Sequence, residues 1–335
     1  MILYWAAVLA ISILLYVLLD GFDLGIGILF AGARSDADRE SMISAIAPIW
    51  DGNETWLVAT GVVLWGAFPV VYATLLSAFY LPLFFMLGGL ILRGIAFEFR
   101  DRTERWRWLW DASFVGGSLV ATFMQGLTVG ALVQGLPISN GRYVGGNLDW
   151  LSAFALLCGV GLCIGYALLG ASWLVRKCDG EVREFAYRLI PRLSIALLVF
   201  LIAVFVIALA DNLRVMERWI ERPYLLVLPA IGALAARMLA TSIRRRTDRT
   251  PFRMVVIIFL TAFGTLAISF WPYMIPFSIT IEQAASPHSS LAFMFWGAGL
   301  VVFPLTLLYT AVSYSVFRGK VWSSEPMTAG SAHAS

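Results

Sequence analysis

Long apolar runs with few charges recur along the whole chain, and they constrain its fold more than any other feature. A helix that crosses a bilayer needs about 20 mostly apolar residues. Nine stretches meet this requirement, at residues 2–33, 44–66, 73–98, 112–135, 150–174, 191–211, 224–242, 254–273 and 290–317. Backbone polar groups must be satisfied inside lipid, so runs of this kind predict helices. We therefore expect an all-α, polytopic membrane protein with about nine transmembrane helices.

The composition excludes several other classes of protein. Only 13% of the 335 residues are charged, about half the share of roughly 25% in a soluble domain. A soluble enzyme, a nucleic-acid-binding protein and a disordered chain are therefore excluded. The net charge of +3 is too small to imply an anionic partner such as nucleic acid.

The spacing of the runs predicts one transmembrane domain over residues 1–322 and a disordered cytoplasmic tail at 323–335. Nine helices leave room for two four-helix bundles and one peripheral helix. The connection around residues 66–72 is short enough to make the second and third spans a tight hairpin. Glycines spaced as GxxxG, at Gly21/Gly25 among other places, allow close helix approach and predict bundle packing.

The basic residues predict the orientation. One set of alternate loops contains 18 of them and the opposite set contains 4. Because cytoplasmic loops carry the excess of Lys and Arg, we expect the amino terminus outside and the carboxyl terminus in the cytoplasm.

Four carboxyl groups inside the first two spans are the most informative positions, because such a group costs about 2.5–3.5 kcal/mol at the bilayer centre. Asp20 and Asp23 lie in the first span, and Asp51 and Glu54 lie in the second. At about 1.5 Å per residue, they occupy overlapping depths of roughly 10–20 Å from the cytoplasmic ends. Each pair has i,i+3 spacing, which places both members on one helix face. We expect the two pairs to face each other as a ladder towards mid-membrane.

Two roles are open for this ladder. Carboxyl groups can exchange protons along hydrogen-bonded water, which makes a proton relay. Alternatively, Asp20 or Asp23 caps a helix or pairs with Arg93, and Asp51 lies at the membrane interface. The residues favour the relay for Asp51 and Glu54 and leave both roles open for the first-span acids.

Ligands for haem or a metal are scarce in this chain. Haem iron is typically held by His, Met or Cys, and the two histidines are His288, near the last span, and His333, in the tail. No His pair falls on one helix face, so we expect no metal site and no haem bound by this chain alone. Trp50 and Trp56 could pack against a quinone, although interfacial belts explain most tryptophans equally well.

Several motifs together resemble subunit II of the cytochrome bd family of quinol oxidases. They are LDGFDLGIG at 19–27, IAPIWDGNETW at 46–56, FPVVY at 68–72 and RGIAFEFR at 93–100. The combination of DGFDLG and WDGNxxW is highly specific, and the resemblance is dense over residues 1–115. The short loop at 211–223 and the modest length resemble the cyanide-insensitive branch.

The resemblance implies a heterodimeric quinol oxidase that reduces oxygen to water in the bacterial inner membrane. The larger subunit I holds two b-type haems and one d-type haem, or a third b-type haem, and oxidises quinol. Subunit II holds no haem and stabilises its partner, and in some members it supplies a proton path or an oxygen channel. A small single-helix accessory subunit is a further expected partner, with membrane lipid and quinone around the complex.

The resemblance also assigns roles to residues. Asp51 matches the family's proton-path aspartate, and Trp50 and Trp56 match the tryptophans that flank it. Asp20 and Asp23 match the first-helix acids.

Other residues of these motifs are carried over less directly. Asn53, Arg93 and Arg100 are expected to flank the relay or to lie at the subunit interface. Glu54 often corresponds to a neutral residue in relatives.

Two alternative functions remain. A scaffold subunit without proton traffic would tolerate a neutral residue at Asp51. A secondary transporter would place a midplane site at broken helices. Pro272 and Pro276 could break the eighth span, but no matching broken span is evident.

The charge asymmetry leads to a topology prediction. Reporter fusions at Asp149 and Gly180 should report the outer and the cytoplasmic side, respectively. The reverse pattern would overturn the orientation and with it the cytoplasmic access of the four acids.

Overall fold

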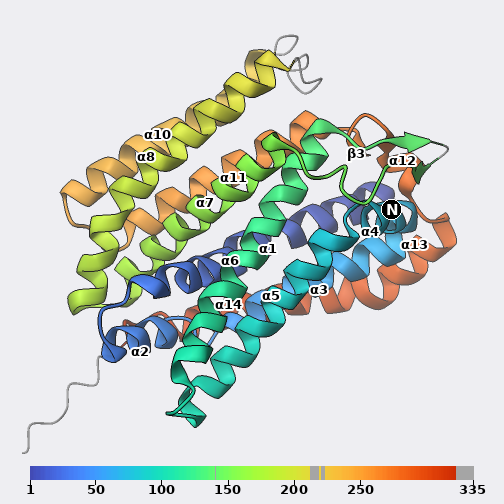
Figure 1. The fold of residues 1–335 in the computed structure, drawn as a ribbon. Coiled ribbons are helices and arrows are strands. Elements are labelled where there is room, and N and C mark those ends of the chain that lie inside the picture. The colour runs from blue at the N-terminus through green and yellow to red at the C-terminus, as the bar shows by residue number, and fades with distance from the viewer. Residues whose placement is uncertain (140, 212–218, 220–222, 322–335) are drawn as a thin grey trace, which may run out of the picture.

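The protein is built almost wholly from helices that run side by side (Figure 1). The computed structural model describes residues 1–139, 141–211, 219 and 223–321. The tail predicted at 323–335 and most of the loop at 211–223 lie outside these residues.

The long helices follow the predicted spans. They are α1 (Ile2–Leu29), α3 (Trp50–Ala67), α5 (Tyr80–Phe99), α6 (Arg107–Gln134), α7 (Ala153–Lys177), α8 (Gly180–Ala210), α10 (Val227–Arg244), α11 (Thr250–Phe270) and a last span formed by α13 (His288–Met294), η4 (Phe295–Val302) and α14 (Phe303–Val316). In the described residues, eight helices are long and apolar enough to cross a membrane, or nine if α3 and the bent helix after it form one span. The expected all-α polytopic membrane fold is confirmed.

Short elements connect these helices. They are η1 (Phe30–Gly32), α2 (Asp36–Ser44), α4 (Pro69–Ala78), η2 (Arg100–Arg102), the hairpin of β1 (Ile138–Ser139) and β2 (Arg142–Tyr143), η3 (Pro223–Leu226), the hairpin of β3 (Tyr273–Ile275) and β4 (Ile279–Thr280), and α12 (Ile281–Ala284). Figure 1 shows α2 at one end of the molecule and β3, α12 and the amino terminus at the other. We call the α2 end the basic end. It comprises residues 30–49, 100–107, 176–192, 244–253 and 317–321.

The connection predicted as a tight hairpin is a bent pair of helices instead. The axes of α3 and α4 differ by 119°, and the backbone of Phe68 between them is not helical. Pro69 starts α4, where its missing N–H costs nothing and its fixed φ suits a helix start. The third crossing helix therefore begins at Tyr80 and not at residue 73.

The prolines near the eighth span lie beyond its helix. α11 ends at Phe270, Pro272 directly precedes β3, and Pro276 lies between β3 and β4. They therefore do not break a transmembrane helix. A transporter would need such a broken helix to form its midplane binding site, and these prolines do not provide one.

The helices pack as two groups of four. One group contains α1, α3, α5 and α6, and the other contains α7, α8, α10 and α11. α1 and α6 join the groups because both pack against α7 as well as against each other. The last span is peripheral, and α14 has no buried residue. This arrangement agrees with the predicted pair of bundles and peripheral helix.

Glycine makes the contact between α1 and α7 possible. A Cβ atom on Gly25 would lie 1.8 Å from the carbonyl oxygen of Tyr166, and one on Gly170 would lie 2.6 Å from the backbone of Gly25. The two backbones therefore touch, as the GxxxG spacing predicts.

Ion pairs hold the loops of the basic end together. Arg183 donates two hydrogen bonds, of 3.0 and 2.6 Å, to one oxygen of Asp248, and Lys320 donates to the other at 2.9 Å. Burial would raise the pKa of Asp248, but these hydrogen bonds and charges outweigh burial and lower the pKa below its ordinary value. Asp248 therefore remains ionised at neutral pH.

The α1–α7 contact leads to a stability prediction. Gly25→Ala should lower the free energy of unfolding by about 1–3 kcal/mol, because an overpacked core forces backbone shifts. Gly116→Ala is the matched control, because a Cβ there meets no atom within 4 Å. The thermal unfolding of the purified protein measures both. Equal midpoints for the two variants would contradict the backbone contact.

Candidate functional site

A buried guanidinium joins three helices of the first group. The Arg93 side chain of α5 is 3% exposed. Its Nη1 lies 2.6 Å from Asp20 Oδ1 on α1, and its Nη2 lies 3.1 Å from Glu54 Oε2 on α3. The structure thus contains the pairing of Asp20 with Arg93 that was one of the two predicted roles.

The second acid of α1 is held by an amide. Asn53 Nδ2 donates to Asp23 Oδ2 at 2.7 Å and to the Leu19 carbonyl at 3.3 Å. The hydroxyl of Tyr314, on α14, donates to Asn53 Oδ1 at 2.9 Å. The last span therefore reaches the same site as α1 and α3. We call Asp20, Asp23, Asn53, Glu54 and Arg93 the acid cluster.

The acid cluster contains more carboxyl groups than cations. Asp20 and Asp23 are fully buried, and Asp20 Oδ2 and Asp23 Oδ1 have no hydrogen-bond partner among the described residues. With all three carboxyls ionised, the single guanidinium would leave two negative charges uncompensated. An uncompensated buried charge costs several kcal/mol. The site therefore favours a state in which a carboxyl group carries a proton.

Exposure increases from the buried pair towards the fourth predicted acid. Asp20 is buried, the Glu54 side chain is 29% exposed, and Asp51 is exposed. Asp51 lies in the first turn of α3, one turn before Glu54. The structure brings Asp20, Asp23 and Glu54 together, whereas Asp51 lies on the open side of α3 with no side-chain partner in the described residues.

The two predicted tryptophans pack between helices. Trp50 lies against Phe97 of α5, with ring centroids 4.9 Å apart. Trp56 is fully buried and meets Phe303 of α14 edge-on at 6.1 Å. Both side chains fix the position of α3, on which Glu54 and Asp51 lie.

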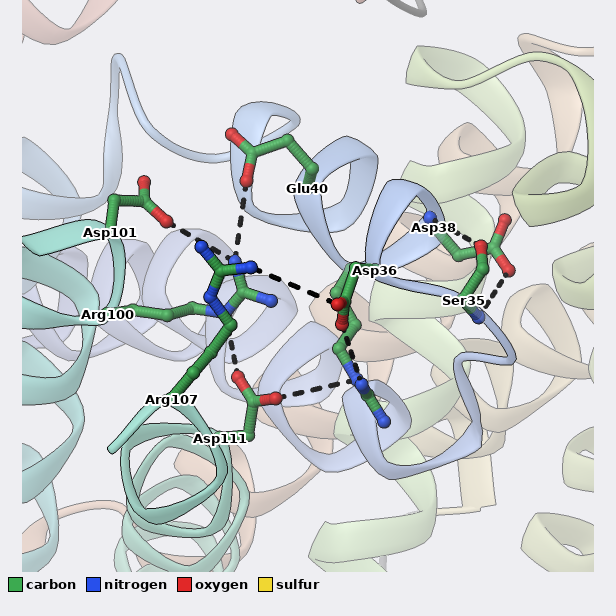
Figure 2. Close-up of polar contacts among 9 residues, drawn as sticks. Ser35, Asp36, Asp38, Glu40, Arg100, Asp101, Arg107 and Asp111 are labelled. Atoms are coloured by element: carbon green, nitrogen blue, oxygen red, sulfur yellow. Dashed lines mark hydrogen bonds and ion pairs between the residues drawn. The ribbon is translucent and has the colours of Figure 1, made fainter. Parts of the chain in front are cut away.

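Arg100 belongs to a different group of charges, at the basic end (Figure 2). Its Nε donates to Asp111 at 2.7 Å, and its Nη1 lies 3.4 Å from Glu40 and 3.3 Å from Asp101. These contacts hold α2 against the adjacent ends of α5 and α6. Arg100 therefore ties the elements of the basic end together and does not contact the acid cluster.

A chain of neutral polar groups lies beyond Asp20, and the sequence reasoning missed it. Gln125 Nε2 donates to the Tyr16 hydroxyl at 2.8 Å, and the Tyr166 hydroxyl donates to Gln125 Oε1 at 3.1 Å. Tyr16 precedes Asp20 by four residues, which places both on one face of α1. An amide within an apolar span was the signal that could have identified Gln125.

The described residues do not fit a haem. Their one histidine, His288, is exposed at the start of α13. No group of three His, Cys, Asp or Glu that could hold a metal ion occurs in the part of the chain that the structure describes.

Comparisons with known proteins give one consistent family. A family model described as cytochrome bd terminal oxidase subunit II matches residues 1–317. The chain is 30% identical to the cytochrome bd-I ubiquinol oxidase subunit 2 of Escherichia coli (strain K12), over 95% of this chain and 94% of the relative. It is 28% identical to the cytochrome bd ubiquinol oxidase subunit 2 of Bacillus subtilis (strain 168), over 97% and 98%.

A solved structure has a similar fold. A chain of the bd oxidase from Geobacillus thermodenitrificans matches with a TM-score of 0.76, over 94% of this chain and 96% of that chain. The sequence identity is 17%, so this likeness concerns the fold alone.

The buried ion pair of Arg93 and Asp20 leads to a prediction in which a second substitution partly restores what the first one loses. Arg93→Gln should strongly reduce the yield and unfolding temperature of the protein, because loss of one partner of a buried pair costs about 3–5 kcal/mol. Adding Asp20→Asn should restore part of the loss, because it removes the uncompensated charge. Arg105→Gln, at an exposed arginine, is the control. An unfolding temperature of Arg93→Gln equal to that of the control would refute the role of the pair.

Proposed function

The chain belongs to the cytochrome bd terminal oxidase subunit II family, and on this basis we propose that it takes up protons for its partner as well as stabilising it. It is a subunit of a quinol oxidase that reduces oxygen, in a bacterial inner membrane. The observation that supports proton uptake is the graded exposure of Asp51, Glu54 and Asp20.

The family implies a haem-bearing subunit I as the partner. We assign to that partner two b-type haems and one d-type haem, or a third b-type haem, together with quinol oxidation. Since the described residues of this chain do not fit a haem, its own contribution is made by carboxyl groups. A small single-helix accessory subunit belongs to the same proposal.

Proton uptake begins at Asp51 in this proposal. Its exposed carboxylate lies at the start of α3, on the side of the basic end, and can take a proton from water. Glu54 lies one helical turn further in and is partly exposed, so a water molecule can connect the two carboxyl groups. Asp51 lies on the open side of α3, and Glu54 is turned towards Arg93 but keeps a partly exposed side chain, so a proton can pass between them and a neighbouring subunit.

Arg93 positions the inner part of the site. A guanidinium keeps its proton, so Arg93 does not relay protons and instead orients Glu54 and Asp20. Its ion pair with Asp20 supports a positioning role for Asp20. Asp23, which faces an amide and no guanidinium within hydrogen-bond distance, is the better candidate for a buried carboxyl group that holds a proton.

The side of uptake has an energetic consequence. Oxygen reduction to water consumes protons, and we propose that the basic end faces the cytoplasm and supplies them. Moving one charge through 100 mV is worth about 2.3 kcal/mol. Uptake from the cytoplasm therefore lets turnover contribute to the membrane potential.

Substitution of Asp51 tests the proposal. In the assembled oxidase, Asp51→Asn removes the exchangeable proton and keeps the size of the side chain. Quinol oxidase turnover should fall at least tenfold, about 1.4 kcal/mol in the barrier, with a normal haem spectrum and yield. Asp51→Glu should retain more activity than Asp51→Asn.

Glu104→Gln is the matched control, because it neutralises another exposed carboxyl group near the basic end. It should leave turnover unchanged. Wild-type turnover of Asp51→Asn with intact haems would reject the relay and leave the scaffold function.

A further inference from the structure

A hollow opens beside the basic end, away from the acid cluster. Its volume is about 300 Å³, and it lies between the segment that follows α1, at η1 and Arg34, and the first four turns of α8. Its lining residues are Gly32, Arg34, Phe185, Arg188, Leu189 and Arg192. Half of these residues are arginines and the others are apolar or glycine.

The three arginines are exposed and are not engaged by carboxylates. In the described residues Arg34, Arg188 and Arg192 form no ion pair, whereas Arg100 and Arg183 at the same end do. The hollow therefore has three available guanidinium groups, which bind phosphate oxygens with strong charge-assisted hydrogen bonds.

The nearest acids leave this positive charge in excess. Asp38 and Glu181 line a smaller adjoining hollow, which shares Arg34 and Arg188. The Asp38 carboxylate already accepts the Ser35 backbone N–H as part of the α2 cap. The larger hollow itself has no acidic lining residue.

The α8 side of the hollow alternates apolar and basic side chains along one helix face. Phe185, Arg188, Leu189 and Arg192 have the spacing i, i+3, i+4 and i+7, which describes a single face. Such a face suits a ligand that has an anionic group and an apolar body.

The depth of this face coincides with a membrane boundary. Residues 193–210 of α8 contain no charged side chain and span about 27 Å, close to the roughly 30 Å of a bilayer's hydrocarbon core. Arg192 directly precedes this run, and Arg34 follows the apolar run of α1 and η1. Both guanidinium groups thus lie at the level of lipid phosphates.

We propose that the hollow binds an anionic phospholipid of the surrounding membrane. Arg34, Arg188 and Arg192 hold its phosphate, and Phe185 and Leu189 contact the upper part of an acyl chain. The bound lipid bridges α1 and α8, which belong to different helical groups. This site is independent of the proposed proton uptake, because it shares no residue with the acid cluster.

Lipid titration of the purified, delipidated oxidase complex tests this proposal. Phosphatidylglycerol binding is followed by native mass spectrometry for the wild-type complex and for Arg188→Gln/Arg192→Gln. The apparent Kd should rise at least tenfold in the double variant. Arg244→Gln/Arg245→Gln is the matched control, because it removes two exposed charges at the same end and should bind as the wild type does.

Two further measurements identify the ligand class. Phosphatidylcholine should bind at least tenfold more weakly than phosphatidylglycerol, and millimolar inorganic phosphate should not displace the bound lipid. Unchanged binding in the double variant, equal binding of the two lipids or displacement by free phosphate would each overturn the proposal. If the double variant fails to assemble, Arg34→Gln provides the same comparison from the α1 side.

Discussion

The buried guanidinium of Arg93 is the interaction on which the rest of the structure depends. An ionised Asp20 inside the bilayer is tolerated because a cation lies 2.6 Å away and compensates its charge. The same guanidinium holds Glu54 and therefore sets the positions of α1 and α3 relative to α5. Since α1 also packs on α7, one ion pair fixes the position of one of the two helices, α1 and α6, that connect the groups of four.

The close packing of α1 and the charge of the cluster support each other. Gly25 brings the backbone of α1 against α7, so α1 has little freedom to rotate and Asp20 and Asp23 cannot turn towards lipid. Asn53 and Tyr314 then supply hydrogen bonds that lipid could not. Two carboxylate oxygens, Asp20 Oδ2 and Asp23 Oδ1, have no hydrogen-bond partner among the described residues and are the remaining cost of burying these acids.

The sequence predicted where the helices lie along the chain better than it predicted how each helix is rotated about its own axis. Length and apolarity identified the spans, and the rarity of membrane charges identified Asp20, Asp23, Glu54 and Arg93, because both signals are local. The exposure of Asp51 was not predictable in this way. It lies about 60° around α3 from Glu54, and only the neighbouring helices decide which of the two is covered. For the same reason the separate contacts of Arg100 and the chain through Gln125 required the tertiary structure.

The hydrogen bond from Tyr314 to Asn53 has a consequence for the order of assembly. Its two partners are 261 residues apart, so ribosomes release the donor long after the first helices have entered the membrane. Arg93 is only 73 residues from Asp20 and 39 residues from Glu54, so these ion pairs can form early in synthesis. The Asn53 amide, in contrast, gains the Tyr314 hydrogen bond only when the last span has been made. In a nascent chain that ends before residue 314, Arg93 can therefore already pair with Asp20 and Glu54, whereas Asn53 Oδ1 lacks the Tyr314 hydroxyl as a donor. Completion of this polar site thus waits for the synthesis and insertion of the last span.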